Sequence, residues 1–419
     1  LNEKRLTELQ RRFDIKTVCG NASYPEVQRS AGMETAHLMV AVTDSDESNM
    51  VACQVAYSLF KTPMKIARIR SPQYFIRSQL YGDDDLPIDE FISPEQLVTQ
   101  RVAKLIHHAG ASQVLDFADG QVKLVVVKPY YGGKFVGYSL QAFHHDFPHA
   151  RVMAIYRGGE PVAIRESTHI EVGDEVIFIA GAKHVDAVLL AFRRMDKPYT
   201  DIMIAGAGNI GARLASVLEG QYHIKLIEHN LERCESVVNQ LNNTTVLCGD
   251  ASDKTLLVNE NIDRFDVFCA VTNDDEANIM SALQAKRLGA RQVMALVNRT
   301  TYVDLIADGE INVIISPEQV TISRILAFVR AGDVVRTYSL HRGEIEVMEA
   351  VAHGEMGASF VVGHSIASLA LPSSVRIAAI VRARHMIIPK PSEVICAGDH
   401  VILFVAEKKQ IARVEQLFQ

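Results

Sequence analysis

The chain has 419 residues, more than one hydrophobic core requires, so two to four domains are expected. Hydrophobic residues make up 48% and charged residues 22%, as in globular proteins, and 50 acidic against 43 basic residues (net charge −7) argue against a nucleic-acid binder. No apolar stretch approaches the roughly eighteen uncharged residues that a membrane-spanning helix needs.

The chain begins with a predicted α/β unit over residues 1–100. Its candidate ligand-binding residues are Gly20, Asn21, Thr43 and Arg68. Arg68 lies on a short apolar run, 66–69. A cation at a strand end beside a nucleotide cleft could hold a phosphate, or it could be a solvated arginine at the sheet edge, and the sequence leaves both open.

A helix is predicted to leave this unit at Ser93-Pro94-Glu95-Gln96, with serine as N-cap, proline at the first helical position and glutamine completing a capping box. It enters a small β-rich lobe, predicted over 101–195, with apolar strands around the Gly173-Asp174 turn and a final helix over 183–192. A second helix of the same kind is predicted to begin at Ser316-Pro317-Glu318-Gln319. Each crossover helix could pack within its own module or against a second subunit.

A glycine-rich motif opens the second α/β unit, predicted over 200–320. An apolar strand, 202–205, runs into Gly206-Ala207-Gly208-Asn209-Ile210-Gly211, and 212–218 has a helical pattern. In such a loop the first glycine permits the tight turn, the second lets a pyrophosphate approach, and the third permits close strand–helix packing. The helix N-terminus would supply N–H donors. The pattern predicts nucleotide binding, unless it is a relic that only shapes the turn.

An acidic residue follows at the expected place. The apolar strand 224–227 ends in Glu228, whose carboxylate can accept both ribose hydroxyls and would repel a 2′-phosphate. The sequence therefore favours NAD over NADP.

The next two strands, 245–248 and 267–271, complete the unit. Ligands bind beyond the carboxyl ends of parallel strands, so Asp250, Ala251, Thr272 and Asn273 are candidate lining residues. Alternatively, Thr272 or Asn273 only caps the next helix, whose dipole favours the acidic residues 274–276.

The whole arrangement is a duplication. Matching blocks pair 19–23 with 248–252 and 41–49 with 270–278, both at an offset of 229, and 92–96 with 315–319 at an offset of 223. A last β-rich lobe, predicted over 321–419, repeats the Gly-Asp turn at 398–399. On this alignment the first copy begins after the position of Glu228, so we expect about 30 residues, carrying a first strand and glycine loop, to precede Leu1.

Two groups of side chains could suggest a metal. Six cysteines form no Cys-x-x-Cys pattern, and Cys19, Cys248 and Cys269 lie in apolar runs, which favours buried free thiols. His144, His145, Asp146 and His149 share no helical face and are followed or interrupted by Pro148, so a polar loop is preferred to a metal site.

The Gly-Asp-Ala-Ser and Ala-Val-Thr-Asn-Asp-Asp-Glu-Ala-Asn blocks with their variants in the first copy, the Ile-Ser-Pro-Glu-Gln turns and the lobes ending in Gly-Asp resemble the regulator-of-potassium-conductance (RCK) domain family. The tandem arrangement is similar to that of the cytosolic, NAD-binding subunits of bacterial Trk potassium-uptake systems. The resemblance covers essentially the whole chain, and the departure from it is the absent first glycine loop.

The resemblance implies a peripheral protein on the cytoplasmic face of the inner membrane, assembled as a homotetramer beneath a potassium-translocating membrane subunit of the Trk type. Family members bind NAD(H), and some bind ATP or ADP. The implied site comprises residues 206–211, Glu228, Asp250, Ala251 and Thr272, and, in the first copy, Gly20, Asn21, Thr43 and Arg68.

A nucleotide-binding α/β protein of this kind could belong to one of three functional classes. An NAD-dependent oxidoreductase needs a second domain with an acid/base group and a substrate pocket, and the residues after the second unit show no convincing constellation. A redox-sensing DNA repressor needs a basic recognition helix, and none is predicted. A nucleotide-sensing, non-enzymatic regulator of potassium transport is favoured, with the oxidoreductase as the alternative.

Overall fold

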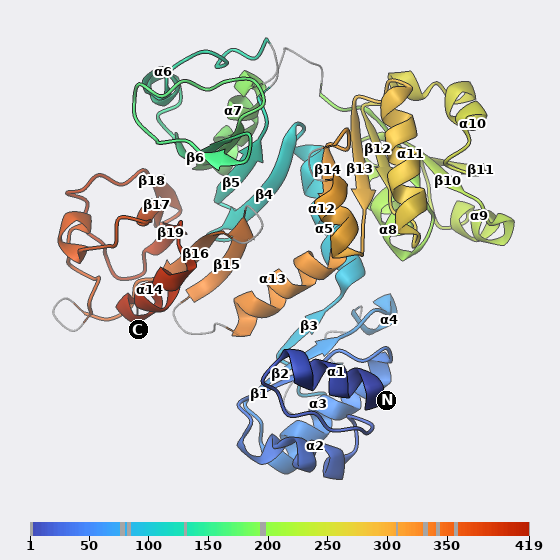
Figure 1. Ribbon diagram of the computed structural model, residues 1–419, viewed down its shortest axis with the longest axis horizontal. Helices are drawn as coiled ribbons and strands as arrows, with labels where there is room; N and C mark the ends of the chain where they lie inside the picture. The colour runs from blue at the N-terminus through green and yellow to red at the C-terminus, as the bar shows by residue number, and fades with distance from the viewer. Residues whose placement is uncertain are drawn as a thin grey trace. The chain divides into compact units, whose positions relative to one another are not determined.

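The computed structural model describes residues 3–75, 80–81, 85–129, 132–192, 198–306, 309–329, 334–340, 344–355 and 359–418. The chain forms two compact units. One contains Leu1–Leu97 with Glu318–Val329, and the other contains Val98–Pro317 with Arg330–Gln419. Figure 1 colours the ribbon along the chain, and the segment 318–329, drawn in orange, belongs to the first unit.

The first unit contains a parallel sheet of order β1-β2-β3. Its strands are β1 (Leu38–Ala41), β2 (Met64–Arg68) and β3 (Glu90–Ile92), and its helices are α1 (Glu3–Arg12), α2 (Pro25–Ala31), α3 (Asp46–Phe60) and α4 (Pro72–Phe75). The Ser45 side chain caps α3 by accepting from the Ser48 N–H. Ala41, Ala52, Cys53 and Ala67 are among the buried residues between α3 and the strands.

Helix α13 (Pro317–Val329) also belongs to this first unit, although it follows the second α/β unit in the chain. Its Arg324 Nε donates to Glu90 Oε1 of β3 at 2.8 Å. The prediction that a crossover helix packs in its own module or on a second subunit is therefore wrong for α13. It packs on the other copy within the same chain.

The second unit contains a six-stranded parallel sheet of order β11-β10-β9-β12-β13-β14. The strands are β9 (Asp201–Ala205), β10 (His223–Glu228), β11 (Thr244–Cys248), β12 (Val267–Ala270), β13 (Gln292–Leu296) and β14 (Val313–Ile315). The helices are α8 (Asn209–Leu218), α9 (Leu231–Val238), α10 (Lys254–Asn259), α11 (Asp275–Arg287) and α12 (Thr300–Ile306). Strand order reverses between β9 and β12, which makes the carboxyl ends of these strands the expected ligand site.

Two antiparallel lobes complete the second unit, with strand orders β4-β5-β8-β6-β7 and β15-β16-β19-β17-β18. The first lobe consists of α5 (Pro94–His107), β4 (Ala111–Phe117), β5 (Val122–Val127), α6 (Leu140–Asp146), β6 (Ala150–Arg157), β7 (Glu160–Pro161), β8 (Glu175–Gly181) and α7 (Val185–Phe192). The second consists of β15 (Val334–Leu340), β16 (Ile345–Val351), β17 (Val375–Arg382), β18 (His385–Ile387), β19 (His400–Val405) and α14 (Ile411–Leu417). The predicted fold class, two Rossmann-type parallel units each followed by a small β-rich lobe, is confirmed.

The repeated Gly-Asp turns have a structural role in these lobes. Gly173 and Gly398 have φ of 84° and 81°, which favours glycine. Each following aspartate is fully buried and accepts two hydrogen bonds from an arginine, Arg157 on Asp174 and Arg382 on Asp399. A buried carboxylate needs such a partner, so the repeated Gly-Asp marks a clamp and not a ligand site.

The two antiparallel lobes share one apolar cluster. It contains Phe117, Leu124 and Ile177 of the first lobe together with Val347 and Phe404 of the second.

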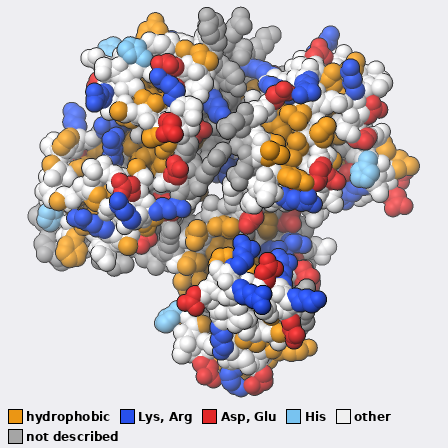
Figure 2. Space-filling model, in the orientation of Figure 1, with side chains coloured by type: hydrophobic (Ala, Val, Ile, Leu, Met, Phe, Trp, Pro, Cys, Tyr) orange, Lys and Arg blue, Asp and Glu red, His pale blue; other side chains and the backbone are white. Residues whose placement is uncertain are grey.

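On the face drawn in Figure 2, basic and acidic side chains are interspersed over the coloured residues.

Candidate functional site

The glycine loop lies directly after β9, at the point where strand order reverses. Gly206 has φ of 98°, and a Cβ there would lie 2.8 Å from the Thr272 Cγ2. A Cβ on Gly211 would lie 1.8 Å from the Gly206 carbonyl oxygen. Both positions therefore require glycine for the turn and for helix–strand packing.

Gly208 differs from these two. A Cβ there would meet nothing within 4 Å, and its φ of −66° suits any residue. A glycine at 208 therefore leaves open space at the N-terminus of the following helix, although the backbone conformation there does not require glycine. Helix α8 begins at Asn209, and no side chain caps it. Its first-turn N–H groups, including that of Ile210, are available to an anion that enters beside Gly208.

Glu228 supports the loop from the end of β10. Its side chain is buried, Oε2 accepts from the Ala207 N–H at 2.8 Å, and Oε1 accepts from the Asn230 N–H at 2.9 Å. The exposed His229 imidazole lies 3.0 Å from Oε1. A carboxylate offers about four acceptor directions, so Glu228 can hold the loop and still accept a ribose hydroxyl.

Arg233 is a loop contact that the sequence analysis missed. It lies in the first turn of α9, and its Nε donates to the Ala207 carbonyl at 2.7 Å. Ala207 is thus held by Glu228 through its N–H and by Arg233 through its carbonyl oxygen. The one available signal was a cation shortly after the acidic residue, which is too common a pattern to single out.

Asp250 and Ala251 follow β11 at the same edge. Asp250 Oδ1 accepts from the Ser252 N–H at 2.8 Å and from its hydroxyl at 2.7 Å, and these bonds lower the pKa of the Asp250 carboxyl. Ala251 packs against the apolar cluster beneath the sheet. The Asp250 side chain is exposed, so the turn presents a carboxylate to solvent beside Glu228.

Thr272 and Asn273 follow β12. Neither is the cap of α11, because the Asp274 side chain accepts from the Ala277 N–H, so the predicted capping role is wrong for both. Thr272 is instead fixed by Asn278, which accepts from its N–H and hydroxyl at 2.9 and 2.7 Å and donates to its carbonyl at 3.0 Å. Thr272 therefore forms a rigid wall facing Gly206, and Asn273 is exposed.

The first copy repeats this framework around Thr43. Asn49 accepts from the Thr43 N–H and hydroxyl at 2.8 and 2.7 Å, and the Asn21 side chain accepts from the N–H and hydroxyl of Ser23. A Cβ on Gly20 would lie 2.6 Å from a Val27 methyl, so helix α2 packs tightly there.

Arg68 ends β2 and turns back toward Thr43. Its Nη2 donates to the Thr43 carbonyl at 2.5 Å, while its buried Nε has no hydrogen-bond partner. Burial, together with the nearby Arg70, lowers the pKa of Arg68. The alternative of a solvated edge arginine is therefore wrong, because the guanidinium is half-buried beside the strand ends.

The cysteine and histidine predictions need correction. Cys269 is buried as expected, and burial raises its pKa to about 12, but Cys19 and Cys248 are exposed because they lie at the carboxyl ends of their runs. His144, His145 and Asp146 lie on helix α6 and not in a loop. Within the described ranges, no group of three or more His, Cys, Asp or Glu side chains could hold a metal, and no helix is long and apolar enough to cross a membrane.

Comparison with protein families agrees with this architecture. The TrkA-N domain matches residues 1–94 and 202–317, and the TrkA-C domain matches 124–193 and 358–419. The Trk system potassium uptake protein TrkA of Halomonas elongata is 50% identical over 417 residues, covering 99% of this chain and 91% of that protein. The counterpart from Vibrio alginolyticus is 49% identical over 421 residues, covering 100% and 92%.

Solved structures show the same fold at lower identity. The crystal structure of the GsuK RCK domain has a TM-score of 0.59 and 19% identity, covering all of this chain and 88% of that one. The structure of the GsuK channel bound to NAD has the same TM-score and identity and is covered to 73%. The fold expected from the RCK resemblance is confirmed, and the chain belongs to the TrkA family of Trk system potassium uptake proteins.

Proposed function

We propose that this chain is a nucleotide-sensing, non-catalytic regulator that binds NAD(H), and ATP or ADP, and controls a potassium-translocating membrane protein. The observation that carries the proposal is the open space at Gly208, at an uncapped helix N-terminus, with the Glu228 carboxylate on the adjacent strand. These features suit a pyrophosphate and a ribose, respectively. The NAD-bound GsuK channel, which shares the fold, supports the choice of ligand.

The proposed second-copy site comprises residues 206–211, Glu228, Asp250, Ala251, Thr272 and Asn273. We assign a matching first-copy site to Gly20, Asn21, Thr43 and Arg68, in which Arg68 would meet a phosphate. An acid at 228 disfavours a 2′-phosphate, so NAD is preferred over NADP.

Helix α8 offers a route from this site to the antiparallel lobes. It begins at the glycine loop and ends at Leu218, whose carbonyl accepts from the Tyr222 N–H at 3.1 Å. The Tyr222 hydroxyl lies 2.8 Å from His107 Nδ1 on α5. Movement of α8 on anion binding would therefore reach α5 directly.

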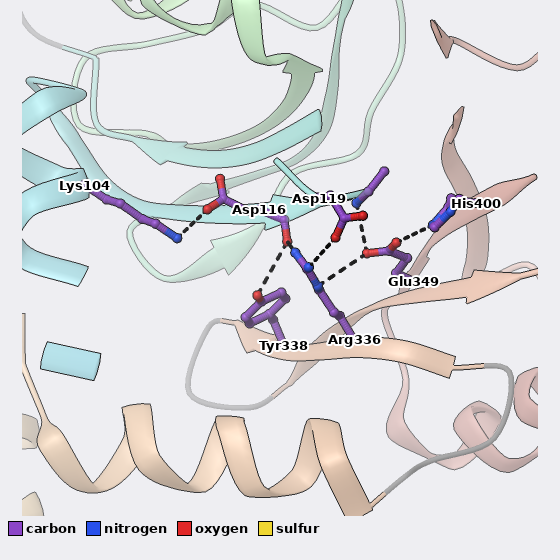
Figure 3. Close-up of polar contacts among 8 residues, drawn as sticks. Lys104, Asp116, Asp119, Arg336, Tyr338, Glu349 and His400 are labelled. Carbon is purple, nitrogen blue, oxygen red and sulfur yellow. Dashed lines mark hydrogen bonds and ion pairs between the residues drawn. The ribbon is translucent and has the colours of Figure 1, made fainter. Parts of the chain in front are cut away.

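From α5 a polar network continues across both lobes (Figure 3). Lys104 pairs with Asp116 of β4, and Arg336 of β15 donates to the Asp116 carbonyl at 3.3 Å. Glu349 is almost fully buried; its carboxylate lies 2.6 Å from His400 Nδ1 and 3.9 Å from Arg336 Nε. Because a buried carboxylate tolerates few partner arrangements, the network would transmit a shift of α5 instead of absorbing it.

We further propose that the four lobes at 1–100, 101–195, 200–320 and 321–419 act as the moving modules, with α13 moving with the first of them, to which it belongs. Tandem units of this family would assemble as a homotetramer on the cytoplasmic face of the inner membrane, against a Trk-type membrane subunit. The relatives named as Trk system proteins support this partner.

Calorimetric titration of the full chain with NADH, NAD, ATP and ADP tests the ligand. Gly208→Glu should weaken binding at the second copy at least 100-fold, about 2.7 kcal/mol, because its side chain fills the pyrophosphate space. Gly220→Glu is the matched control, since a Cβ there also meets nothing within 4 Å. If Gly208→Glu bound all four nucleotides like the parent, the site would be wrong.

Co-purification with a potassium-translocating membrane protein, with transport measured against nucleotide, tests the partner. Turnover of NADH with carbonyl compounds would instead indicate an oxidoreductase.

A further inference from the structure

Two cysteines lie beside the backbone of Glu228, and the proposed nucleotide site uses neither thiol. Cys248 is the last residue of β11 and pairs in register with Glu228, the last residue of β10. Cys234 lies on α9, and its thiol donates to the Glu228 carbonyl at 3.4 Å. One thiol therefore approaches Glu228 from the neighbouring strand, and the other from the helix that follows it.

The two thiols are also close to each other. Helix α9 packs on β11, and the Glu228 carbonyl that accepts from the Cys234 thiol also accepts from the N–H of Gly249, the residue after Cys248, at 2.8 Å. Burial, and to a smaller extent the neighbouring Cys248 thiol, raises the pKa of Cys234 to about 11. Cys248 is exposed, whereas Cys234 is buried. An accessible thiol backed by a buried one is the arrangement of an attacking and a resolving cysteine.

We propose that Cys234 and Cys248 form an oxidation site that closes to a disulfide in the presence of a peroxide and thereby weakens nucleotide binding at the second copy. The Cys248 sulfur attacks one peroxide oxygen, the O–O bond breaks, and water leaves, which gives a sulfenic acid. The Cys234 sulfur then attacks the Cys248 sulfur, the S–O bond breaks, and a second water leaves. Two thiols are oxidised to one disulfide while one peroxide is reduced to two waters.

The link to the nucleotide site runs through the segment between the two cysteines. Forming the disulfide takes the Cys234 thiol away from the Glu228 carbonyl and draws α9 toward β11. Arg233, the preceding residue of α9, holds the Ala207 carbonyl, and Glu228 holds the Ala207 N–H. Displacing α9 therefore disturbs both contacts that position the glycine loop. This consequence rests on the proposed nucleotide function, but the oxidation chemistry does not.

The first copy provides a natural comparison. At the offset of 229, Cys19 corresponds to Cys248, but Arg5 occupies the position of Cys234. Cys19 is exposed and has no resolving thiol at the equivalent place. Peroxide should therefore leave Cys19 as a sulfenic or higher acid, while Cys248 becomes cross-linked.

The full chain, reduced and then treated with hydrogen peroxide, should yield a Cys234–Cys248 disulfide by peptide mass mapping. Cys234→Ser should replace the disulfide with a Cys248 sulfenic acid that dimedone traps, and Cys396→Ser should leave the disulfide unchanged. The oxidation site is refuted if both thiols stay reduced at peroxide levels that oxidise Cys19 and Cys396, or if Cys248 cross-links elsewhere.

NADH titration of the same samples tests the consequence. Oxidised parent should bind about tenfold more weakly than reduced parent, with recovery on adding dithiothreitol and no change in Cys234→Ser. A disulfide with unaltered NADH affinity would overturn the link to binding. Absence of NADH binding in the reduced parent would count against the proposed function, and the mass mapping would still decide the oxidation site.

Discussion

The two parallel units share a hydrogen-bonded framework but place different chemistry on it. In the first copy, Asn49 fixes Thr43 and donates to the Arg68 carbonyl at 2.8 Å. In the second, Asn278 fixes Thr272 and donates to the Leu296 carbonyl at 2.9 Å. The backbone contact is the same, yet one strand ends in a cation and the other in an apolar residue. The two copies therefore share the asparagine that builds the edge, while the residue at the end of the neighbouring strand differs.

The largest expected effect falls on the shared framework. Asn278→Ala removes four hydrogen bonds from a fully buried site and leaves the Thr272 and Leu296 groups unsatisfied, so the free energy of unfolding should fall by about 2–4 kcal/mol. Asn49→Ala should cost a similar amount in the first copy. Chemical denaturation measures both, and an effect in only one copy would break the proposed equivalence.

The crossover helices give a second matched pair, at the offset of 223. Arg324 of α13 has Glu90 as a partner, whereas Arg101 of α5 has a buried Nε without one, and burial lowers the pKa of Arg101. Arg101→Met should raise the free energy of unfolding by up to about 1 kcal/mol, because it removes a buried Nε that has no hydrogen-bond partner. Arg324→Met should lower it by up to about 1 kcal/mol. Equal signs for the two variants would contradict this distinction.

Arg68→Leu replaces the cation at the end of β2 with the residue type found at the end of β13, Leu296. The guanidinium has a buried, unpartnered Nε, so the unfolding free energy should change by less than about 1 kcal/mol. Binding of ATP at the first copy should weaken about tenfold if Arg68 meets a phosphate. Calorimetry on a Gly208→Glu background isolates that copy, and unchanged ATP affinity would make Arg68 purely structural.

The smallest effect concerns pH. Asp250 has a pKa lowered from 3.8, whereas its counterpart Asn21 does not titrate. A lowered folded-state pKa contributes stability that is present above the unfolded-state pKa and is lost as pH falls through the folded-state value. Stability of the parent should therefore decline slightly more than that of Asp250→Asn below about pH 4. Identical acid unfolding curves would show that this carboxylate contributes nothing.

Much of this arrangement could be predicted from sequence. The Gly-x-Gly-x-x-Gly loop, the acidic end of β10 and the duplicated blocks are local patterns. Their residues determine the local backbone conformation, so a sequence can reveal them. The contact of Arg233 with Ala207 and the packing of α13 in the first unit could not be predicted, because they depend on which surfaces meet after folding. The sequence alone does not single out the cap of α11, since Thr272, Asn273 and Asp274 are all good caps and the hydrogen bonds of Thr272 to Asn278, within α11, decide among them.

Helix α13 belongs to the first unit although it follows the second α/β unit in the chain, and this placement limits how the chain can be divided. The first compact unit contains 318–329 from the second repeat, and the second compact unit contains the antiparallel lobe of the first repeat. Cutting the chain between its repeats would separate α13 from Glu90 and divide the apolar cluster that the two antiparallel lobes share. We therefore expect each repeat, expressed alone, to be less stable than it is in the full chain.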